Sequence, residues 1–418
     1  MGVIGLSIAK AFPEAEVVLR DRDSLAVAFT EHNRILNKLK GVTAWKDPAT
    51  GEERRARPAP RVEWGLLGDG REGGRESDFD FVLSNLPAKA GAPVLASFFA
   101  RLSGRLSASP GGCGAGGAMA LLAPGGRAAV VVVKPLAGAA AGWIAEAGLV
   151  VVAHESGSGH DVYVVELAPA AASGVAPASG TPGSEAREHE SSAHERAPAA
   201  DLGPLAPPPP YFRGESRFKL ADLAYRAQGF WGLPEFDTPG YGSSVVAEVL
   251  GRIFPDGGAA PSSCPKVLLV EPGVGHAAIW VAKELRPSLI AAVSRDALSL
   301  EATAANLSAL QLRAGPEYLP FDALGVEGLE PSAFEPSKPS AFDLIVERPV
   351  IVPERDWTAP AWERAGGLLR PGGIYLACSS PTESARLEKR RPSAGAARWS
   401  LLCRKRKKGF VAAAWRLG

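Results

Sequence analysis

The sequence predicts an α/β protein of two tandem Rossmann-like domains, the first of which lacks its first strand. Two stretches, near residues 20 and 295, repeat the same succession of helix, strand, polar turn and helix. Each is followed by an apolar strand that ends in a polar turn, at Asn85 and at Glu347. A segment rich in Ala, Pro, Gly, Ser and Glu separates the two repeats.

The length of 418 residues fits this organisation. We expect a first domain at 1–167, a disordered linker at 168–210 that ends in four prolines, and a second domain at 211–418.

Composition argues against a strongly basic nucleic-acid-binding protein and against a disulfide or zinc framework. The formal net charge of +1 gives no overall positive potential that would attract nucleic acid, and the four cysteines form no Cys-x-x-Cys pair. We therefore expect reduced thiols in a cytoplasmic protein and no metal site. No signal peptide opens the chain, and the longest apolar region, 128–153, contains Lys134, Pro135 and Glu146. This region predicts a globular helix and strand rather than a membrane span.

The first repeat begins with a predicted helix over 3–12 and a strand over 15–20 that ends at Asp21. A second helix follows to Asn37, with Ser24 as its expected N-cap. A carboxylate at the end of such a strand accepts hydrogen bonds from the ribose hydroxyls of a bound nucleotide. The alternative is that Asp21 only caps the helix.

The strand that starts at Phe79 leads into Asn85-Leu86-Pro87-Ala88. Open α/β sheets place their chemistry at the carboxyl ends of their strands, which is where Asn85 and Pro87 would lie. An ordinary turn between a strand and a loop remains the alternative for these four residues.

The second repeat contains a glycine-rich loop. A strand at 266–270 leads into Glu271-Pro272-Gly273-Val274-Gly275-His276-Ala277 and then a helix. Glycines there let the backbone approach a cofactor in front of a helix amino terminus. Aligning Asn306 with Asn33 puts Ser294 at the position of Asp21, since 306 − 12 = 294 and 33 − 12 = 21.

These motifs resemble those of class I S-adenosylmethionine-dependent methyltransferases, and in particular two-domain ribosomal RNA guanine-N2 methyltransferases. Asn85 to Ala88 is similar to the family's Asn-Pro-Pro-(Phe/Tyr) loop, in which Asn and a Pro carbonyl accept the hydrogens of the target amine. The spacings 33 − 21 = 12 and 37 − 33 = 4 match the family's acid-to-asparagine pattern. Pro239-Gly240-Tyr241 resembles a segment that covers the cofactor.

The resemblance implies methyl transfer from S-adenosylmethionine to an exocyclic amine of a nucleobase in ribosomal or other RNA. It implies a catalytic role for Asn85 and Pro87. The implied cofactor-binding residues are Gly2, Asp21, Asp69 and Asn85, with Glu271, Gly273 and Gly275 in the second repeat.

The sequence also departs from the family pattern. Ala88 replaces the aromatic residue that stacks on the base. Gly2 would be the final glycine of a loop whose strand, leading acid and first two glycines are missing, so a miscalled start, a fragment or a decayed domain are all open. In the ribosomal family the second domain is catalytic, whereas neither repeat here carries every motif.

Two other functions are compatible with the same motifs. One is a catalytically decayed RNA-binding or scaffold protein, and the other is a Rossmann-type oxidoreductase, which the Asn-x-Pro loop and the closing hairpin disfavour. The run Arg404-Lys405-Arg406-Lys407-Lys408 could contact the RNA backbone or form a solvated hairpin.

Overall fold

A computed structural model describes most of both repeats. The described residues are 2–12, 14–41, 45–46, 53–54, 59–66, 79–105, 120–168, 211–255, 265–309, 317–320, 342–352, 356–392 and 398–418. They form two compact units, residues 1–69 with 212–418 and residues 70–211, each of which is described by itself. Asp69 and nearly all of the predicted linker lie outside the described residues, so their predicted roles stay predictions.

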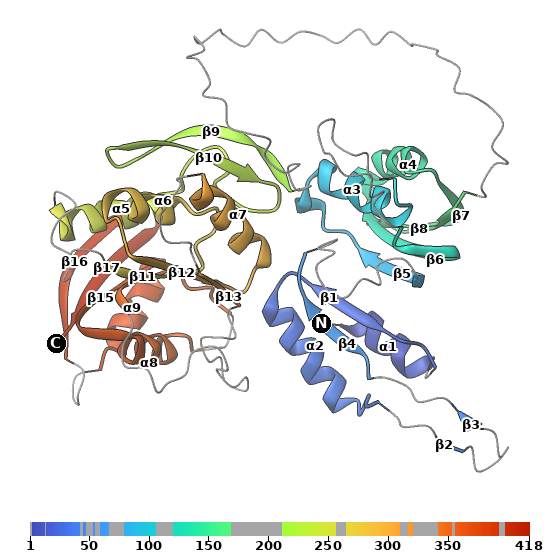
Figure 1. Ribbon diagram of the computed structural model, residues 1–418, viewed down its shortest axis with the longest axis horizontal. Coiled ribbons are helices and arrows are strands. Elements are labelled where there is room, and N and C mark those ends of the chain that lie inside the picture. Colours follow the sequence, from blue (N-terminus) through green and yellow to red (C-terminus); the bar gives the residue numbers. More distant parts are fainter. Residues whose placement is uncertain are drawn as a thin grey trace, which may run out of the picture. The chain divides into compact units, whose positions relative to one another are not determined.

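The carboxy-terminal repeat is built on a seven-stranded sheet in the order β13-β12-β11-β14-β15-β17-β16 (Figure 1). The strands are β11 (Lys266–Val270), β12 (Leu289–Ser294), β13 (Glu317–Pro320), β14 (Phe342–Glu347), β15 (Leu369–Ser379), β16 (Trp399–Lys407) and β17 (Phe410–Leu417). The first five strands in that order pair in parallel, and β17 is antiparallel to both β15 and β16. This repeat therefore has the expected α/β organisation, and its sheet is mixed because the last two strands form an antiparallel hairpin.

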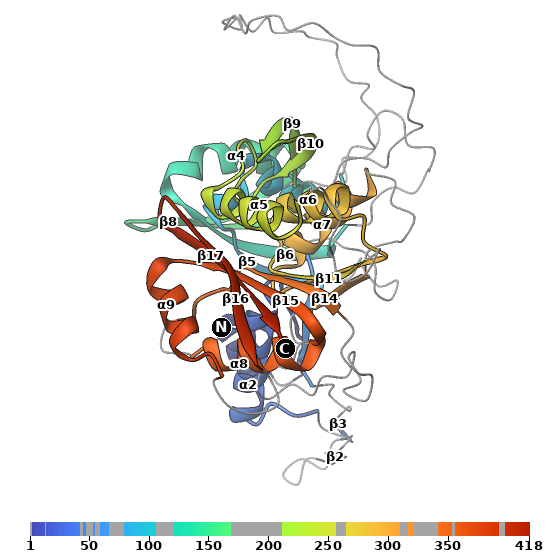
Figure 2. The ribbon, with the colours of Figure 1, turned by 90° about the vertical axis from the view of Figure 1, so that its left-hand side faces the viewer.

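Helices cover both faces of this sheet, with α5 and α6 on one side and α8 and α9 on the other (Figure 2). The helices are α5 (Tyr241–Ile253), α6 (His276–Glu284), α7 (Ala297–Ser308), α8 (Thr358–Leu368) and α9 (Pro381–Lys389). An antiparallel hairpin, β9 (Phe212–Leu220) with β10 (Leu223–Phe230), precedes them.

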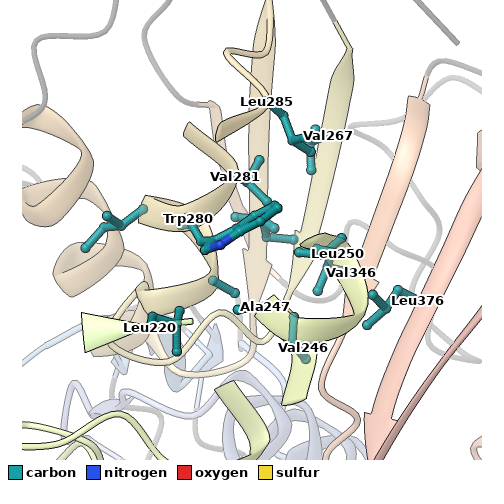
Figure 3. Packing of buried hydrophobic residues seen from close by; sticks show 14 of the residues in the cluster. Leu220, Val246, Ala247, Leu250, Val267, Trp280, Val281, Leu285, Val346 and Leu376 are labelled. Carbon is teal, nitrogen blue, oxygen red and sulfur yellow. The ribbon is translucent and has the colours of Figure 1, made fainter. Parts of the chain in front are cut away.

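Alternation along the strands explains the two apolar layers. Val267 of β11 packs with α5 and α6 around Trp280 and Leu250 (Figure 3), whereas its neighbour Leu268 packs on the opposite face with Trp362 of α8. A parallel strand covered on both faces must be apolar throughout, as the sequence of β11 is after its first residue.

The amino-terminal repeat begins with α1 (Val3–Ala11), β1 (Val18–Asp21), α2 (Ser24–Leu36) and β4 (Arg61–Trp64). β1 and β4 form a two-stranded parallel sheet, and the short strands β2 (Trp45–Lys46) and β3 (Glu53–Arg54) form another pair. The N-cap of α2 is Asp23 and not Ser24 as expected, because the Asp23 carboxylate accepts the N–H of Leu25 at 3.0 Å.

The second compact unit holds a four-stranded sheet in the order β5-β6-β8-β7. Its elements are β5 (Phe79–Asn85), η1 (Ala88–Ala90), α3 (Ala92–Leu102), β6 (Leu122–Val133), η2 (Lys134–Leu136), α4 (Ala137–Glu146), β7 (Leu149–Ser156) and β8 (His160–Leu167). β5 is parallel to β6, and the last two strands form the closing hairpin that the sequence predicts.

The two repeats correspond element by element. Residues 2–33 match residues 275–306 without a gap, at a constant separation of 275 − 2 = 273. The pair β4-β1 corresponds to β13-β12, and β5-β6-β8-β7 corresponds to β14-β15-β17-β16. In the second repeat β11 lies between these two groups of strands and pairs with both of them.

Candidate cofactor and substrate site

The strand order of the second repeat marks the candidate site. From β11 the chain proceeds to β12 and β13 on one side, and later to β14 and β15 on the other. Ligands of open α/β sheets bind at such a switch point, outside the carboxyl ends of the strands. The loop after β11 and the turn after β14 both lie at this edge, since Val270 pairs with Glu347.

The glycine-rich loop after β11 has positive φ at three positions. Glu271, Gly273 and Gly275 all have positive φ, at 57°, 65° and 97°. A Cβ on Gly275 would lie 3.2 Å from the backbone Cα of Thr303, which cannot move aside easily. The Gly273 carbonyl accepts hydrogen bonds from the hydroxyls of Ser299 and Thr303 at 3.1 and 3.3 Å. α7 therefore holds the loop in place.

Asn306 fixes the other side of the loop. Its amide nitrogen donates to the Val274 carbonyl at 2.9 Å and to the Gln228 carbonyl at 3.1 Å, and its oxygen accepts the Gln228 N–H at 2.7 Å. The residue that aligns the two repeats in the sequence thus connects the glycine-rich loop to strand β10. Its role in this repeat is structural.

The acid that leads the loop points toward β12. The Glu271 carboxylate accepts the Ser294 hydroxyl at 2.7 Å and the Arg295 N–H at 3.0 Å. Burial raises the pKa of Glu271, and these two hydrogen bonds oppose the rise. Ser294 is itself buried and occupies the position of Asp21 in the first repeat. Both groups are therefore satisfied by one another.

The side chain of Arg348 lies against the same loop. Arg348 follows β14, and a Cβ on Gly273 would lie 3.7 Å from its Nη1. Its guanidinium pairs with Glu235 at 3.0 Å and donates to the Ser243 hydroxyl at 3.3 Å, while Ser243 donates to Glu235 at 2.6 Å. Neither the ion pair nor its position over the loop is evident in the sequence, because Glu235 precedes Arg348 by 113 residues.

The partners of Glu235 determine the direction in which the pKa of its carboxyl is shifted. Burial alone would raise the pKa of its carboxyl, but the charge of Arg348 and the Ser243 hydrogen bond outweigh burial and hold the pKa below the ordinary value. Glu235 is therefore a carboxylate at neutral pH, and it neutralises the guanidinium in the loop.

His276 adjoins this pair at the start of α6 and is 1% exposed. Its Nε2 lies 2.9 Å from the Glu235 carbonyl oxygen, which only accepts, so Nε2 carries the hydrogen. Its Nδ1 then accepts the Tyr225 hydroxyl at 2.7 Å. Burial lowers the pKa of His276, although the Glu235 carbonyl hydrogen bond raises it in part. The imidazole is thus a neutral bridge between β10 and the loop that follows it.

The lowered pKa of His276 predicts a pH dependence. A group with a depressed folded-state pKa contributes stability that is present above its unfolded pKa, near 6.5, and is lost as the pH falls. We expect the free energy of unfolding to decrease below pH 6.5 by up to about 1.4 kcal/mol per pH unit. Chemical denaturation at pH 7.5, 6.5 and 5.5 measures this slope. His276→Gln should remove it, whereas a matched change at the exposed His160 should not; an unchanged slope in His276→Gln would contradict the assignment.

The second repeat has Glu347 where the first has Asn85. Glu347 is 3% exposed and accepts hydrogen bonds from Arg364 at 2.7 Å and from the Tyr375 hydroxyl at 2.9 Å. Burial raises the pKa of Tyr375, so this hydroxyl stays a donor. Glu347 is accordingly fixed inside the domain.

The first repeat presents different groups at the equivalent positions. Gly2 is the left-handed N-cap of α1, with φ at 71°, and a Cβ there would lie 2.7 Å from the Thr30 Oγ1. The separation of 273 places Gly2 opposite Gly275. Gly2 therefore corresponds to the middle glycine of the loop and not to the final glycine, which was the expectation. Close contact between α1 and α2 is sufficient to require glycine at this position.

Asp21 ends β1 and is exposed. Its Oδ1 accepts the Asp23 N–H at 2.9 Å, and Asp23, not Asp21, caps α2. The alternative in which Asp21 serves as the helix cap is therefore wrong. The carboxylate stands at the carboxyl end of its strand, which is where the resemblance expects a ribose-binding acid.

Asn85 ends β5, pairs with Val131 and is exposed, as is Pro87. The Leu86 N–H donates to the Val131 carbonyl at 3.0 Å, and the Pro87 carbonyl accepts the Ala90 N–H at 2.9 Å. The turn is thus held by backbone hydrogen bonds on both sides of Pro87. Its Asn85 side chain stands at the carboxyl end of the strand.

A polar cluster that is not evident in the sequence lies at the end of β6. Asp161 is 4% exposed and accepts hydrogen bonds from Lys134 at 2.8 Å and from Ser156 at 3.0 Å, with His154 Nε2 at 3.2 Å. The Lys134 hydrogen bond holds the pKa of Asp161 below its ordinary value. β6 is parallel to β5, so this cluster and Asn85 lie at the same edge of the sheet.

The chain was compared with known protein families, sequences and structures. No protein-family model and no curated protein sequence matches the chain. Among solved structures, the Thermus thermophilus 16S rRNA N2 G1207 methyltransferase RsmC, in complex with AdoMet and guanosine, is 18% identical with a TM-score of 0.49, covering 82% of this chain and 74% of that chain. The Lactobacillus delbrueckii ribosomal protein L11 methylase is 13% identical with a TM-score of 0.31, covering 41% of this chain and 76% of that chain. A Pyrococcus furiosus methyltransferase is 14% identical with a TM-score of 0.30, covering 37% of this chain and 75% of that chain.

The chain is similar in structure to these methyltransferases. The second repeat brings its three predicted cofactor-binding residues together, since Glu271, Gly273 and Gly275 form one loop. Gly2 and Asp21 belong to one compact unit, and Asn85 and Pro87 belong to the other. Among the described residues, no helix is long and apolar enough to cross a membrane.

Proposed function

We propose that the chain transfers a methyl group from S-adenosylmethionine to an exocyclic amine of a nucleobase in RNA, with ribosomal RNA as the implied substrate and the cytoplasm as its compartment. One contrast carries the proposal. In the first repeat Asp21 and Asn85, which match the family's motifs, are exposed at the carboxyl ends of their strands. Their counterparts in the second repeat, Ser294 and Glu347, are buried and hydrogen-bonded within the domain. We therefore assign the chemistry to the first repeat.

The proposal includes the domain organisation of the sequence analysis, with methyltransferase-like domains at 1–167 and 211–418 and a linker at 168–210. It also includes a first repeat without a counterpart of β11. In the second repeat β11 pairs with both equivalent groups of strands.

In the proposed reaction an exocyclic amine would attack the methyl group directly, the bond between that carbon and the sulfonium sulfur would break, and S-adenosylhomocysteine would leave with the electron pair. The only proton transfer needed is the loss of one proton from the methylated nitrogen to water. The Asn85 side-chain oxygen would accept one amine hydrogen, and the Pro87 carbonyl would accept the other with the lone pair that Ala90 leaves free. Orientation of the amine toward the cofactor then supplies most of the rate. In this proposal Gly2 allows close approach of the cofactor, and Asp21 and Asp69 bind its ribose and adenine.

The cofactor assignment predicts the effect of changing Asp21. Asp21→Ser should weaken S-adenosylmethionine binding by about 1.5–3 kcal/mol, the contribution of a charged hydrogen bond. Serine is the matched replacement, because Ser294 accepts the Asp296 N–H at 3.0 Å and so maintains the same turn. Isothermal calorimetry on the full chain measures the affinity.

Two further variants make this test specific. Asp222→Ala removes an exposed carboxylate from the β9–β10 turn and should leave the affinity unchanged. Gly273→Ala, which changes the loop of the second repeat, should also leave it unchanged if the cofactor binds to the first repeat. Equal affinity of the wild type and Asp21→Ser would remove Asp21 from the binding site.

A catalytically decayed RNA-binding or scaffold protein is the second candidate. The observation that favours it is the second repeat, where Arg348 lies over the glycine-rich loop and Glu271 is bonded to Ser294. Labelled methyl groups from S-adenosylmethionine would enter total RNA under the first proposal. RNA binding without any incorporation would favour the second candidate.

The basic run of the β16–β17 hairpin tests the RNA part of the proposal. Glu248 pairs with Lys405 and with Lys407, the latter at 2.6 Å, so these two side chains face α5. Arg404, Arg406 and Lys408 are exposed. Replacing these three by Gln should weaken RNA binding and lower the slope of log K against log salt by about 2. Lys405→Gln with Lys407→Gln is the matched control; equal slopes for both variants would indicate a solvated hairpin.

A further inference from the structure

The turns that follow β1 and β12 contact one another within the first compact unit. They are equivalent in the two repeats, because Arg22 and Asp23 correspond to Arg295 and Asp296 at the separation of 273 residues. Each turn directly follows the residue at the ribose position, Asp21 in one repeat and Ser294 in the other.

The backbone contact is reciprocal. The Ser24 N–H donates to the Arg295 carbonyl at 2.8 Å, and the Ala297 N–H donates to the Arg22 carbonyl at 3.0 Å. Residues 23 and 296 form an isolated antiparallel bridge between these bonds. Each repeat therefore gives and receives the same hydrogen bond.

The side chains repeat this reciprocity. Arg22 pairs with Asp296 at 3.4 Å, and Arg295 pairs with Asp23 at 3.6 Å. Each aspartate also caps its own helix, accepting the N–H of the residue two positions later. The same carboxylates thus start α2 and α7 and join the repeats.

Trp64 of the first repeat hydrogen-bonds to both turns. It pairs with Asp21 across the β1–β4 ladder, and its indole N–H donates to the Arg22 carbonyl at 2.8 Å and to the Arg295 carbonyl at 3.1 Å. Trp64 therefore lies between the two turns and binds equivalent atoms of both.

The first repeat needs this support at β1. β1 has four residues and pairs only with β4 among the described strands, and a two-stranded sheet is marginal by itself. Asp21 is oriented by the Asp23 N–H, which belongs to the same turn that the second repeat holds. Any loosening of the turn would move the carboxylate.

We propose that Arg295 and Asp296 of the second repeat are positioning residues for cofactor binding by the first repeat. Through the paired turns they hold the Asp21 carboxylate in the orientation that the ribose requires. This inference rests on the proposed function, in which Asp21 binds the ribose of S-adenosylmethionine. The second repeat would thereby contribute to binding without contacting the cofactor.

The test removes the ion pairs and keeps the helix caps. Asp296→Asn retains an N-cap acceptor, and Arg295→Gln removes the charge opposite Asp23. In the full chain we expect the double variant to bind S-adenosylmethionine about tenfold more weakly, with unchanged thermal stability of the second repeat. Hydrogen exchange should show loss of protection at the Ser24 amide.

Matched controls separate positioning from general stability. Arg20→Gln breaks an ion pair of β1 with Glu63, at 2.7 Å, that lies inside the first repeat, and it should leave the affinity unchanged. Arg295→Lys with native Asp296 should restore the affinity and the protection of Ser24.

The outcomes distinguish this inference from the proposed function. If Asp21→Ser weakens binding while the double variant binds as the wild type does, the positioning role is overturned and the cofactor assignment stands. If Asp21→Ser binds as the wild type does, or the wild type does not bind the cofactor, the cofactor assignment fails and the positioning role fails with it.

Discussion

Replacement of Asn85 by alanine is expected to lower methyl transfer to RNA about 100-fold, the loss typical of removing one hydrogen-bonding group that acts on the transition state. The amide oxygen would accept a hydrogen of the target amine as positive charge develops on its nitrogen. The affinity for S-adenosylmethionine should change little, so the effect belongs to turnover. Transfer of labelled methyl groups into total RNA under saturating cofactor measures it.

Two substitutions serve as controls for Asn85→Ala. Lys89→Ala changes an exposed residue of the same turn and should leave turnover unchanged. Asn37→Ala removes an exposed amide from the end of α2, and it should also have no effect on turnover. Equal incorporation by the wild type and Asn85→Ala would exclude Asn85 from the mechanism.

Arg348→Ala is expected to destabilise the second repeat by about 3–5 kcal/mol, the cost of leaving one partner of a largely buried ion pair alone. The Glu235 side chain is 10% exposed and would retain only Ser243 as a polar partner of its carboxylate. Equilibrium denaturation followed by tryptophan fluorescence measures the loss, because Trp280 and Trp362 are buried in the two cores of this repeat.

A double variant can show whether Arg348→Ala destabilises the repeat through the lost charge or through lost packing. Arg348→Met with Glu235→Gln removes both charges and should recover much of the stability that Arg348→Ala loses. Arg226→Ala breaks an exposed pair with Glu215, whose side chains are 62% and 49% exposed, and should cost no more than about 0.5 kcal/mol. A loss of that size for Arg348→Ala would show that the guanidinium is not needed to neutralise Glu235.

Local patterns were sufficient to predict the α/β class and several strands and helices of both repeats. The apolar strand before Glu271 and the glycine-rich loop that follows it were predicted from short stretches of sequence. The alignment of Asn33 with Asn306 located the repeat because both helices are the same distance from their glycines. Near the ends of elements prediction was weaker: the cap of α2 is Asp23, one residue before the expected Ser24.

Contacts between distant segments could not be predicted. Arg348 follows β14 and Glu235 lies between β10 and α5, and no local pattern encodes that pair. The burial of Glu347 likewise depends on Arg364 and Tyr375, which come from α8 and β15. One signal for the paired turns was present, since both repeats carry Arg-Asp at the same position, but its meaning requires the knowledge that the turns meet.

The paired Arg-Asp turns also bear on how such a chain could arise. A contact in which each side uses the same residues is isologous, the arrangement found in two-fold symmetric homodimers. Arg22, Asp23, Arg295 and Asp296 fulfil that condition inside one polypeptide. A single-repeat ancestor with Arg-Asp at this turn would already possess a self-complementary surface, and duplication of its gene would convert a dimer interface into an internal one.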